Sequence, residues 1–261
     1  MSPISLKETL EEAKSIAREA GDFLRAHAGM QIMEFKGAFD PVTKLDRESE
    51  QMITSRLKKA FPDHGILAEE GTAVQSKAGY CWIIDPLDGT TNYAHGLSAY
   101  AVSMGLTQDG KPVLGVIYAP QFDELFHAVA GGGAFCNDKP LHVSKEANLE
   151  RGFLATGEPY AVRKNLDAHL RFFKNMVNRS LAIRRFGSAS LDLCHVACGK
   201  YDGYWEAELK PWDAAAGILL VEEAGGKISD YRGNPYVLAE SKTLLATNGL
   251  LHTQMMEALA A

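Results

Sequence analysis

The sequence predicts a mixed α/β fold, α+β in its first half and alternating α/β in its second half. Apolar residues recur at helical spacing over 5–29 and 46–60, whereas residues 65–130 form short apolar runs divided by Gly, Pro and Asp turns. From residue 164 onward, helix and strand patterns alternate. No linker or break in composition interrupts the chain, so we expect one domain over 1–261, with an N-terminal half of about 1–145 and a C-terminal half of about 150–261.

Two amphipathic helices are expected at the start of the chain. Ser5-Leu6-Lys7-Glu8 is a capping-box pattern, and the helix that it opens should end near Gly29. The second helix should run from about Asp46 to Ala60, because Pro62 lies just beyond it. The segment 36–41 between them is rich in turn-forming residues.

The remaining elements follow from shorter patterns. Strands are expected at 65–68, 80–84, 99–106, 113–118 and 124–130. Gly131-Gly132-Gly133 then predicts a turn between strands, because a phosphate-binding loop would need a helix pattern and a Lys-Ser or Lys-Thr pair behind it. The second half predicts helices at 164–177, 188–198 and 211–224, strands at 182–185, 201–206 and 244–246, and a last helix capped by Asn248.

Composition and charge exclude several classes of function. The formal net charge of −6 argues against nucleic acid or an anionic membrane as the main partner. No apolar run approaches the roughly 20 residues of a membrane span, and residues 1–5 do not resemble a signal peptide, so we expect a cytoplasmic protein. The four cysteines form no disulfide framework. Cys194, His195 and Cys198 are interpreted as core helix residues, because no second ligand pair has the spacing of a zinc site.

The most informative segment is Trp82–Asn92, in which an apolar run ends on two aspartates followed by a glycine and two threonines. Asp85 and Asp88 would point to opposite faces of a straight strand. Pro86 fixes φ and removes a backbone donor, so we expect the strand to break there and the two carboxylates to converge. Carboxylates bind hard cations, and backbone N–H groups in a Gly-Thr turn that opens a helix bind phosphate. The segment therefore predicts a metal-assisted phosphate site.

A competing interpretation is a phosphatase of the haloacid dehalogenase type, in which the first aspartate becomes phosphorylated. Those enzymes place one residue between their aspartates, whereas Pro86 and Leu87 separate Asp85 from Asp88 here. The additional residue would misplace the second carboxylate. The spacing therefore favours direct attack by water between metal ions.

Further acidic residues are candidates on weaker local grounds. Glu69-Glu70 follows an apolar strand pattern, so one glutamate should face the site, although an exposed acidic turn fits equally well. Asp213 and Asp46 lie near the starts of predicted helices, where an isolated aspartate is more often a cap than a functional group.

Together these segments resemble the inositol monophosphatase family of magnesium-dependent, lithium-sensitive phosphatases. The motifs that carry the resemblance are Glu69-Glu70, Trp82–Asn92, Trp212-Asp213 and Glu222–Gly226, with support from Asp40–Thr43, Asp46 and Gly187-Ser188-Ala189. They occur in order over nearly the whole chain. The resemblance reverses the local interpretations of Glu69, Asp46 and Asp213.

The resemblance implies a layered αβαβα sandwich of the sugar-phosphatase type, usually a homodimer. Glu69, Asp85 and the backbone carbonyl of Leu87 would hold one Mg²⁺ ion. Asp85, Asp88 and Asp213 would hold a second ion, and a third would lie near Glu69. Lithium is the expected inhibitor.

The resemblance also implies roles in catalysis and substrate binding. Glu69, together with Thr90 paired to Asp46, would orient a metal-bound water that attacks phosphorus without a phospho-enzyme. The N–H groups of Gly89 and Thr90 would hold the phosphate. The substrate-binding residues implied are Asp88, Gly89, Thr90, Ala189, Glu206 and Asp213.

The substrate itself is less well defined, because the same scaffold serves inositol monophosphates, fructose 1,6-bisphosphate, histidinol phosphate and 3′-phosphoadenosine nucleotides. Glu206 favours a polyol with a free hydroxyl group. Arg184 and Arg185 would suit a second phosphate, or they are solvated charges at a strand end. Lys36 lies in the region of a family lysine, and the loop 158–164 could form part of the pocket wall.

We therefore expect a Mg²⁺-dependent phosphomonoesterase with myo-inositol 1-phosphate as the first candidate substrate. The enzymatic alternatives are the other three substrates of the scaffold. The alternative from another class is a non-catalytic regulatory or binding protein, which the complete set of acidic residues argues against.

Overall fold

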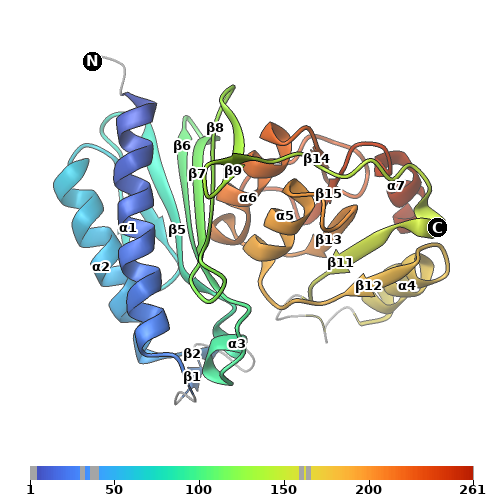
Figure 1. Ribbon diagram of the computed structural model, residues 1–261, viewed down its shortest axis with the longest axis horizontal. Helices are drawn as coiled ribbons and strands as arrows, with labels where there is room; N and C mark the ends of the chain where they lie inside the picture. Colours follow the sequence, from blue (N-terminus) through green and yellow to red (C-terminus); the bar gives the residue numbers. More distant parts are fainter. Residues whose placement is uncertain (1–4, 30–32, 36–40, 159–161, 163–165, 261) are drawn as a thin grey trace.

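The computed structural model describes residues 5–29, 33–35, 41–158, 162 and 166–260. Its elements form five layers in the order helix, sheet, helix, sheet, helix (Figure 1). This arrangement confirms the predicted mixed α/β class and the layered αβαβα sandwich implied by the resemblance. The helices of the three helical layers are, in turn, α1 (Leu6–Ala26) with α2 (Lys44–Ala60), α5 (Ala189–Ala197) with α6 (Pro211–Glu223), and α4 (Leu166–Val177) with α7 (His252–Ala260).

The first sheet has eight strands in the order β10-β9-β8-β7-β6-β5-β3-β4. Neighbouring strands are antiparallel except for the parallel pair β3 and β5. Its strands are β3 (Gly65–Ala68), β4 (Ala73–Val74), β5 (Tyr80–Asp88), β6 (Ala101–Gln108), β7 (Lys111–Ala119), β8 (Glu124–Val129), β9 (Gly133–Cys136) and β10 (Lys139–Pro140). A separate pair, β1 (Glu34–Phe35) and β2 (Pro41–Val42), lies between α1 and α2 in the chain.

The second sheet has five strands in the order β12-β11-β13-β15-β14. The strands β12, β11 and β13 run parallel, and β15 pairs antiparallel with β13 on one side and with β14 on the other. Its strands are β11 (Phe153–Thr156), β12 (Ala182–Arg184), β13 (Gly203–Ala207), β14 (Lys227–Ser229) and β15 (Thr243–Thr247). The chain therefore leaves the first sheet after residue 140 and enters the second at residue 153.

The main predicted elements are present, with differences at their ends and in the shortest strands. The second helix begins at Lys44 rather than Asp46, because Thr43 is its N-cap. Asn248 accepts a hydrogen bond from Leu251 N at 3.0 Å, just before α7. The Gly131–Gly133 turn is confirmed, and the Glu223 carboxylate accepts hydrogen bonds from its first and third N–H groups. The strands that the sequence did not predict are β1, β2, β4, β9, β10, β11 and β14.

The prediction that the strand breaks at Pro86 is wrong, because β5 continues to Asp88. Asp85 pairs with Ser103 and Asp88 pairs with Ala101, so two residues of β5 oppose one residue of β6. A bulge of this kind tolerates proline, which has no N–H to donate. The additional residue, rather than a turn, brings the two aspartates together.

Helix α6 packs closely on the first sheet because two glycines face it. A Cβ atom on Gly105 would lie 2.8 Å from Ala215 Cβ, and one on Gly115 would lie 2.8 Å from Ala216 O. The facing helix residues from Ala214 to Val221 are all buried. This close approach places Asp213, in the first turn of α6, near Asp88 at the end of β5, whose charge raises the pKa of Asp213.

Within the described residues, no helix is both long enough and apolar enough to cross a membrane.

Candidate active site

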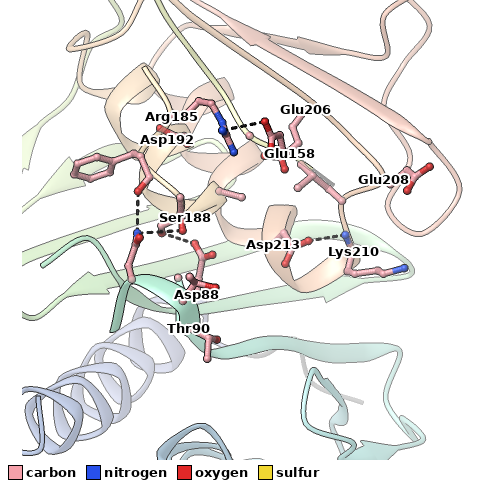
Figure 2. A pocket seen from close by; sticks show the side chains of 18 of the residues that line it. Asp88, Thr90, Glu158, Arg185, Ser188, Asp192, Glu206, Glu208, Lys210 and Asp213 are labelled. Carbon is pink, nitrogen blue, oxygen red and sulfur yellow. Dashed lines mark hydrogen bonds and ion pairs between the residues drawn. The ribbon is translucent and has the colours of Figure 1, made fainter. Parts of the chain in front are cut away.

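A pocket of about 420 Å³ lies where the end of β5 meets α3 (Thr90–Ala94), α5, α6 and the end of β13 (Figure 2). Pockets of this size suit small-molecule ligands. It collects residues that are far apart in the sequence. The predicted site residues that line it are Asp88, Gly89, Thr90, Ala189, Glu206 and Asp213.

Asp88 is held by the start of α5. Its Oδ2 atom accepts a hydrogen bond from Ser188 Oγ at 2.6 Å (Figure 2). The same oxygen accepts hydrogen bonds from Ser190 N at 2.8 Å and from Ser190 Oγ. Burial raises the pKa of Asp88, and the two serines oppose this increase because they stabilise the ionised form. The serine donors thus hold the carboxylate at one orientation beside the pocket.

Asp85 lies behind the pocket, close to the other carboxylates. It is almost fully buried, and its Oδ1 atom accepts a hydrogen bond from Leu87 N at 3.0 Å. Burial raises the pKa of Asp85 well above its usual value, and the negative charges of Glu69, Asp88 and Asp213 raise it further. These four carboxyl groups therefore repel one another when ionised, and they form a cluster that is called the acidic group below.

Asp213 approaches this group from the other half of the chain. Its Oδ2 atom accepts a hydrogen bond from Lys210 N at 2.7 Å, which makes it part of the cap of α6 (Figure 2). Burial raises the pKa of Asp213 well above its usual value, and the negative charge of Asp88 is the second largest cause of the increase. The local prediction of a cap and the prediction of a site residue are therefore compatible.

Thr90 joins the pocket to α2. Its Oγ1 atom lies 2.9 Å from Asp46 Oδ1 and 3.1 Å from Leu87 O, both of which can accept its single hydroxyl proton. The other carboxylate oxygen of Asp46 accepts hydrogen bonds from Thr43 N at 2.8 Å and from Thr43 Oγ1 at 2.5 Å. Asp46 is buried, and burial raises its pKa despite these donors.

Glu69 follows β3 and is held by its backbone. Its N–H donates to Ile84 O on β5 at 3.2 Å. The next part of the loop is anchored by Glu50 of α2, whose carboxylate accepts hydrogen bonds from Glu70 N at 2.6 Å and from Thr72 N at 2.9 Å. A buried carboxylate therefore fixes the course of the loop that carries Glu69.

Gly89 caps α3 in a conformation that requires glycine. Its φ is 91°, and a Cβ atom would lie 2.8 Å from Ala99 O and 3.3 Å from Gly187 O. Asn92 lies in the same short helix and donates from Nδ2 to Ala99 O and Phe186 O, each at 2.8 Å. These contacts tie the segment after β5 to the loop before α5.

Glu206 and Ala189 line the opposite part of the pocket. Tyr204 donates its hydroxyl hydrogen bond to Glu206 Oε2, and a Cβ atom on Gly157 would collide with the same carboxylate. Burial raises the pKa of Glu206 to about 7, and the Tyr204 hydrogen bond partly offsets this increase. Glu206 is therefore packed tightly and titrates close to neutrality.

The two adjacent arginines point in different directions. Arg185 lines the pocket and forms an ion pair with Glu158, with 2.9 Å between Nη1 and Oε1 (Figure 2). Arg184 lies over the ring of Phe153, with its guanidinium carbon 4.8 Å from the ring centre. Lys36 and most of the loop 158–164 lie outside the described residues.

Four predicted residues do not line the pocket but are connected to residues that do, through hydrogen bonds to Thr90 or through charge: Asp46, Glu69, Asp85 and Leu87. In the described part of the chain, no three His, Cys, Asp or Glu side chains are already arranged around one point that could hold a metal ion. The chemistry of the donors nevertheless fits a hard cation, because they are oxygen ligands whose mutual repulsion a divalent ion would relieve. The side chains would have to turn toward such an ion. The ring of His195, in contrast, packs against two aromatic rings. Its centre lies 5.1 Å from the ring centre of Phe186 and 5.1 Å from that of Tyr201.

Sequence reasoning missed the residues that hold the acidic group in place. Ser190 holds Asp88 through its N–H and its hydroxyl group, and Glu50 holds the loop after β3 through both carboxylate oxygens, but neither residue lies in a motif that predicts a ligand. Asn92 and Ser188 lie within Trp82–Asn92 and Gly187-Ser188-Ala189, but neither motif predicts a positioning role for them. A polar residue on the buried face of a predicted helix, as Glu50 is in α2, is the signal that could have been used.

Comparison with known proteins gives the site its context. A family model described as the inositol monophosphatase family matches residues 5–261. The chain belongs to this family. Inositol monophosphatases are phosphoric monoester hydrolases and are generally metal-dependent. The family membership confirms the resemblance identified from the motifs and the prediction of a phosphatase.

Several relatives match over most of their length. The chain is 44% identical over 263 residues to the inositol-1-monophosphatase of Synechocystis, with 100% of this chain and 91% of that protein covered. It is 42% identical over 237 residues to the Nus factor SuhB of Pseudomonas aeruginosa, with 88% of each covered. The crystal structure of the extragenic suppressor protein suhB from Bartonella henselae has a TM-score of 0.92 at 39% identity, covering 97% of this chain and 98% of that chain.

Proposed function

We propose that this inositol monophosphatase family member uses Mg²⁺ to hydrolyse a small polyol phosphate, with myo-inositol 1-phosphate as the first candidate. One observation carries the proposal. Asp85 lies within reach of the charges of Glu69, Asp88 and Asp213, and this acidic group adjoins a pocket of about 420 Å³. Such a group repels a phosphate ester unless cations lie between them.

The metal would be held by oxygen atoms of the acidic group. Glu69, Asp85 and the carbonyl of Leu87 would form one site, and Asp85, Asp88 and Asp213 a second, with further room near Glu69. When bound, Mg²⁺ supplies positive charge that attracts the phosphate and stabilises the charge of the transition state. Lithium is expected to inhibit by competing at these positions.

The chain would orient the attacking water through Thr90 and Glu69. Thr90 Oγ1 directs its proton toward Asp46 Oδ1 or Leu87 O, so its lone pairs remain to accept a hydrogen bond from water. Glu69 would accept the other hydrogen of the same water. The new bond forms between this oxygen and phosphorus while the bond from phosphorus to the alcohol oxygen breaks. The attacking water gives up one proton, and the alcohol oxygen takes up one proton as it leaves, so the products are the alcohol and hydrogen phosphate.

Substrate positioning would use the two sides of the pocket. The N–H groups of Gly89 and Thr90 would hold the phosphate, because the positive φ of Gly89 brings its backbone to the pocket. Asp88, Ala189 and Glu206 would contact the alcohol, and Asp213 would lie beside the leaving oxygen. The polar side chains on this side suit an alcohol that carries hydroxyl groups.

A bisphosphate is the second candidate substrate, and one contact argues against it. Arg185 lines the pocket, but its charge is already paired with Glu158 at 2.9 Å. Arg184 lies over Phe153 instead of the pocket. A second phosphate would therefore have to displace Glu158 from Arg185, whereas a neutral polyol would not.

A regulatory role without catalysis is the alternative from another class. A relative of this chain is named a Nus factor, so the fold by itself is compatible with a regulatory protein as well as with a phosphatase. A purely regulatory protein has no need for buried carboxylates that raise one another's pKa, since such groups cost stability. The acidic group therefore favours the phosphatase.

Phosphate release from a panel of esters tests the proposal. The panel contains myo-inositol 1-phosphate, fructose 1,6-bisphosphate, histidinol phosphate and 3′-phosphoadenosine 5′-phosphate, each with Mg²⁺, with EDTA and with a lithium titration. We expect the inositol ester to react fastest, EDTA to abolish release and lithium to inhibit it. No release from any ester in the presence of Mg²⁺ would refute the enzymatic function.

Asp88→Asn tests the role of the acidic group. The substitution keeps the side-chain size and can still accept hydrogen bonds from Ser188 and Ser190, but it removes a charged ligand. We expect turnover to fall by roughly a hundredfold or more, since a metal contributes several kcal/mol and each 1.4 kcal/mol is tenfold. Circular dichroism should show an unchanged fold. Near-normal turnover would contradict the two-metal assignment.

The homodimer and the cytoplasmic location belong to the same proposal. Exposed apolar side chains on α4 at Leu166, Leu170 and Val177 are consistent with a subunit interface there. Light scattering of the purified protein would give the subunit number directly.

A further inference from the structure

Asp192 is a pocket residue for which the proposed reaction has no use. It lies in the first turn of α5, where its backbone N–H donates to Ser188 O at 3.0 Å. Its side chain borders the pocket with Glu206 and Arg185 (Figure 2). The residue is only 1% exposed, and its Oδ1 atom has no hydrogen-bond partner within the described residues.

A buried carboxyl group without a partner costs stability. Asp202 is also buried, but both of its carboxylate oxygens accept hydrogen bonds. Its Oδ1 atom accepts from Ser144 Oγ at 2.5 Å and its Oδ2 atom from Phe153 N at 2.7 Å. The Oδ1 atom of Asp192 lacks this compensation within the described residues. Its presence beside a pocket is therefore better explained by a ligand than by the fold.

The polar groups around Asp192 are already engaged with the protein. Glu206 accepts the hydrogen bond of Tyr204, Ser188 donates to Asp88, and Arg185 is paired with Glu158. A ligand group that enters this side of the pocket would therefore meet an acid that has free hydrogen-bonding capacity. That acid is Asp192.

We propose that Asp192 determines specificity by hydrogen bonding to a hydroxyl group of the leaving alcohol, an inference that rests on the proposed phosphatase function. Burial raises the pKa of Asp192 well above its usual value, with smaller contributions from the charges of Glu206 and Asp88. A neutral carboxyl group both donates and accepts hydrogen bonds, as a hydroxyl group does. The substrate class is thus a phosphate ester of a polyol, as opposed to an aryl or simple alkyl phosphate.

The test compares two esters in matched variants. The protein and its Asp192→Asn and Asp192→Leu variants are assayed for kcat/KM, at saturating Mg²⁺, with myo-inositol 1-phosphate and with phenyl phosphate, whose leaving group carries no further hydroxyl. Glu208→Gln is the control, because Glu208 is an exposed acid that lines the same pocket. We expect each Asp192 variant to lose about tenfold or more on the inositol ester and less than about twofold on phenyl phosphate. The control should keep the ratio of the two esters.

Deoxygenated substrates give a second measurement in the unmodified protein. Among inositol phosphates that each lack one hydroxyl group, one should lose kcat/KM about as much as the Asp192→Asn variant does. The same analogue should lose little further activity in that variant, because the partner of the hydroxyl is then already absent. The melting temperature of Asp192→Leu should stay the same or rise, since an unpaired buried acid has been replaced by an apolar side chain.

The outcomes separate the inference from the proposal beneath it. If the unmodified protein hydrolyses both esters but the variants change them equally, or if no deoxygenated analogue is coupled to position 192, then Asp192 has no role in specificity. If the unmodified protein hydrolyses neither ester, the phosphatase function itself fails and the inference fails with it.

Discussion

Asp46 serves the fold and the site with the same carboxylate. One oxygen caps α2 through Thr43, and the other accepts the hydrogen bond of Thr90 beside the pocket. Local pattern alone favours the cap, and the family resemblance favours the site. Both interpretations describe the same residue, because a carboxylate has two oxygens with enough lone pairs for both tasks.

Glu50 also uses both of its carboxylate oxygens, although no sequence motif contains it. Its two oxygens hold Glu70 N and Thr72 N, and so fix the loop in which Glu69 lies. Because Glu50 itself does not border the pocket, its effect on catalysis would pass through Glu69. Glu50 is therefore a positioning residue in the proposed site.

Glu50→Gln should weaken Mg²⁺ binding without abolishing it. The neutral amide can accept only one of the two N–H groups well, so the loop that carries Glu69 should loosen. We expect the Mg²⁺ concentration for half-maximal activity to rise by about 10- to 100-fold, with a smaller change in kcat at saturating Mg²⁺. A Mg²⁺ titration of phosphate release measures both values.

Glu48→Gln is the matched control, because Glu48 lies on the same helix and, among the residues that the structure describes, forms an ion pair only with the exposed Lys44. Its Mg²⁺ titration should match that of the unmodified protein. A Glu50 variant with the same titration as this control would show that Glu50 does not position the loop.

Helix α6 connects the two sheets and carries a site residue at its start. It contacts β6 and β7 on one side and β14 and β15 on the other. Its N-terminal turn contains Asp213, and near its C-terminus Glu223 holds the turn after β8. The position of Asp213 therefore depends on how closely α6 packs against the first sheet.

Gly115→Ala should disturb this packing. The new Cβ atom would lie 2.8 Å from Ala216 O and 3.0 Å from Ala216 Cα, and backbone atoms cannot move aside as a flexible side chain can. We expect the free energy of unfolding to fall by about 1–3 kcal/mol and turnover to fall as Asp213 shifts. Urea unfolding and phosphate release measure the two effects.

Gln108→Ala is the control for this change, since Gln108 is exposed at the end of the neighbouring strand β6. Its free energy of unfolding should stay within about 0.5 kcal/mol of that of the unmodified protein. A Gly115→Ala variant as stable as this control would mean that the sheet has room for a methyl group at this position.

We infer from the position of α6 between the sheets that the chain is one cooperative domain, so urea should produce a single transition.

The distribution of buried acids predicts that the stability of the whole molecule depends on pH and on bound metal. Burial raises the pKa of Glu206 to about 7 and the pKa values of Asp85 and Asp213 well above their usual values. An acid whose pKa is higher in the folded state stabilises the fold when protonated. That contribution is complete below the pKa of the unfolded chain and is lost as the pH rises through the folded pKa.

Without metal, the melting temperature should therefore fall as the pH rises from about 5 to 8. Excess Mg²⁺ should reverse the loss at pH 8, by about 2.7 kcal/mol at a hundredfold excess over its dissociation constant. In Glu206→Gln, the decrease between pH 4.5 and about 7 should be smaller, because this acid no longer titrates. Thermal unfolding in EDTA and in Mg²⁺ checks these expectations, and a flat pH profile in EDTA would contradict them.

The sequence alone was sufficient for the fold class, for most helices and long strands, and for the family. Amphipathic spacing and strong motifs are local properties, so they can be read before the chain folds. It failed for very short strands such as β4 and β10, which form only because a longer neighbour offers hydrogen bonds. It also placed a break at Pro86, because proline usually ends a strand and a bulge cannot be recognised without the partner strand.

For the site, the residue types in Trp82–Asn92 predict acidic metal ligands and a phosphate-binding turn, and the structure places Asp88, Gly89 and Thr90 of this segment at the pocket. Tertiary structure alone decided which distant groups join them: Ser190 on Asp88, Glu50 behind Glu69, and Asp192 beside the pocket without a partner. The physical reason is the distance along the chain over which each kind of interaction acts. Backbone preference and hydrophobic period act between residues a few positions apart, whereas hydrogen bonds, burial and repulsion between charges act between any residues that packing brings together.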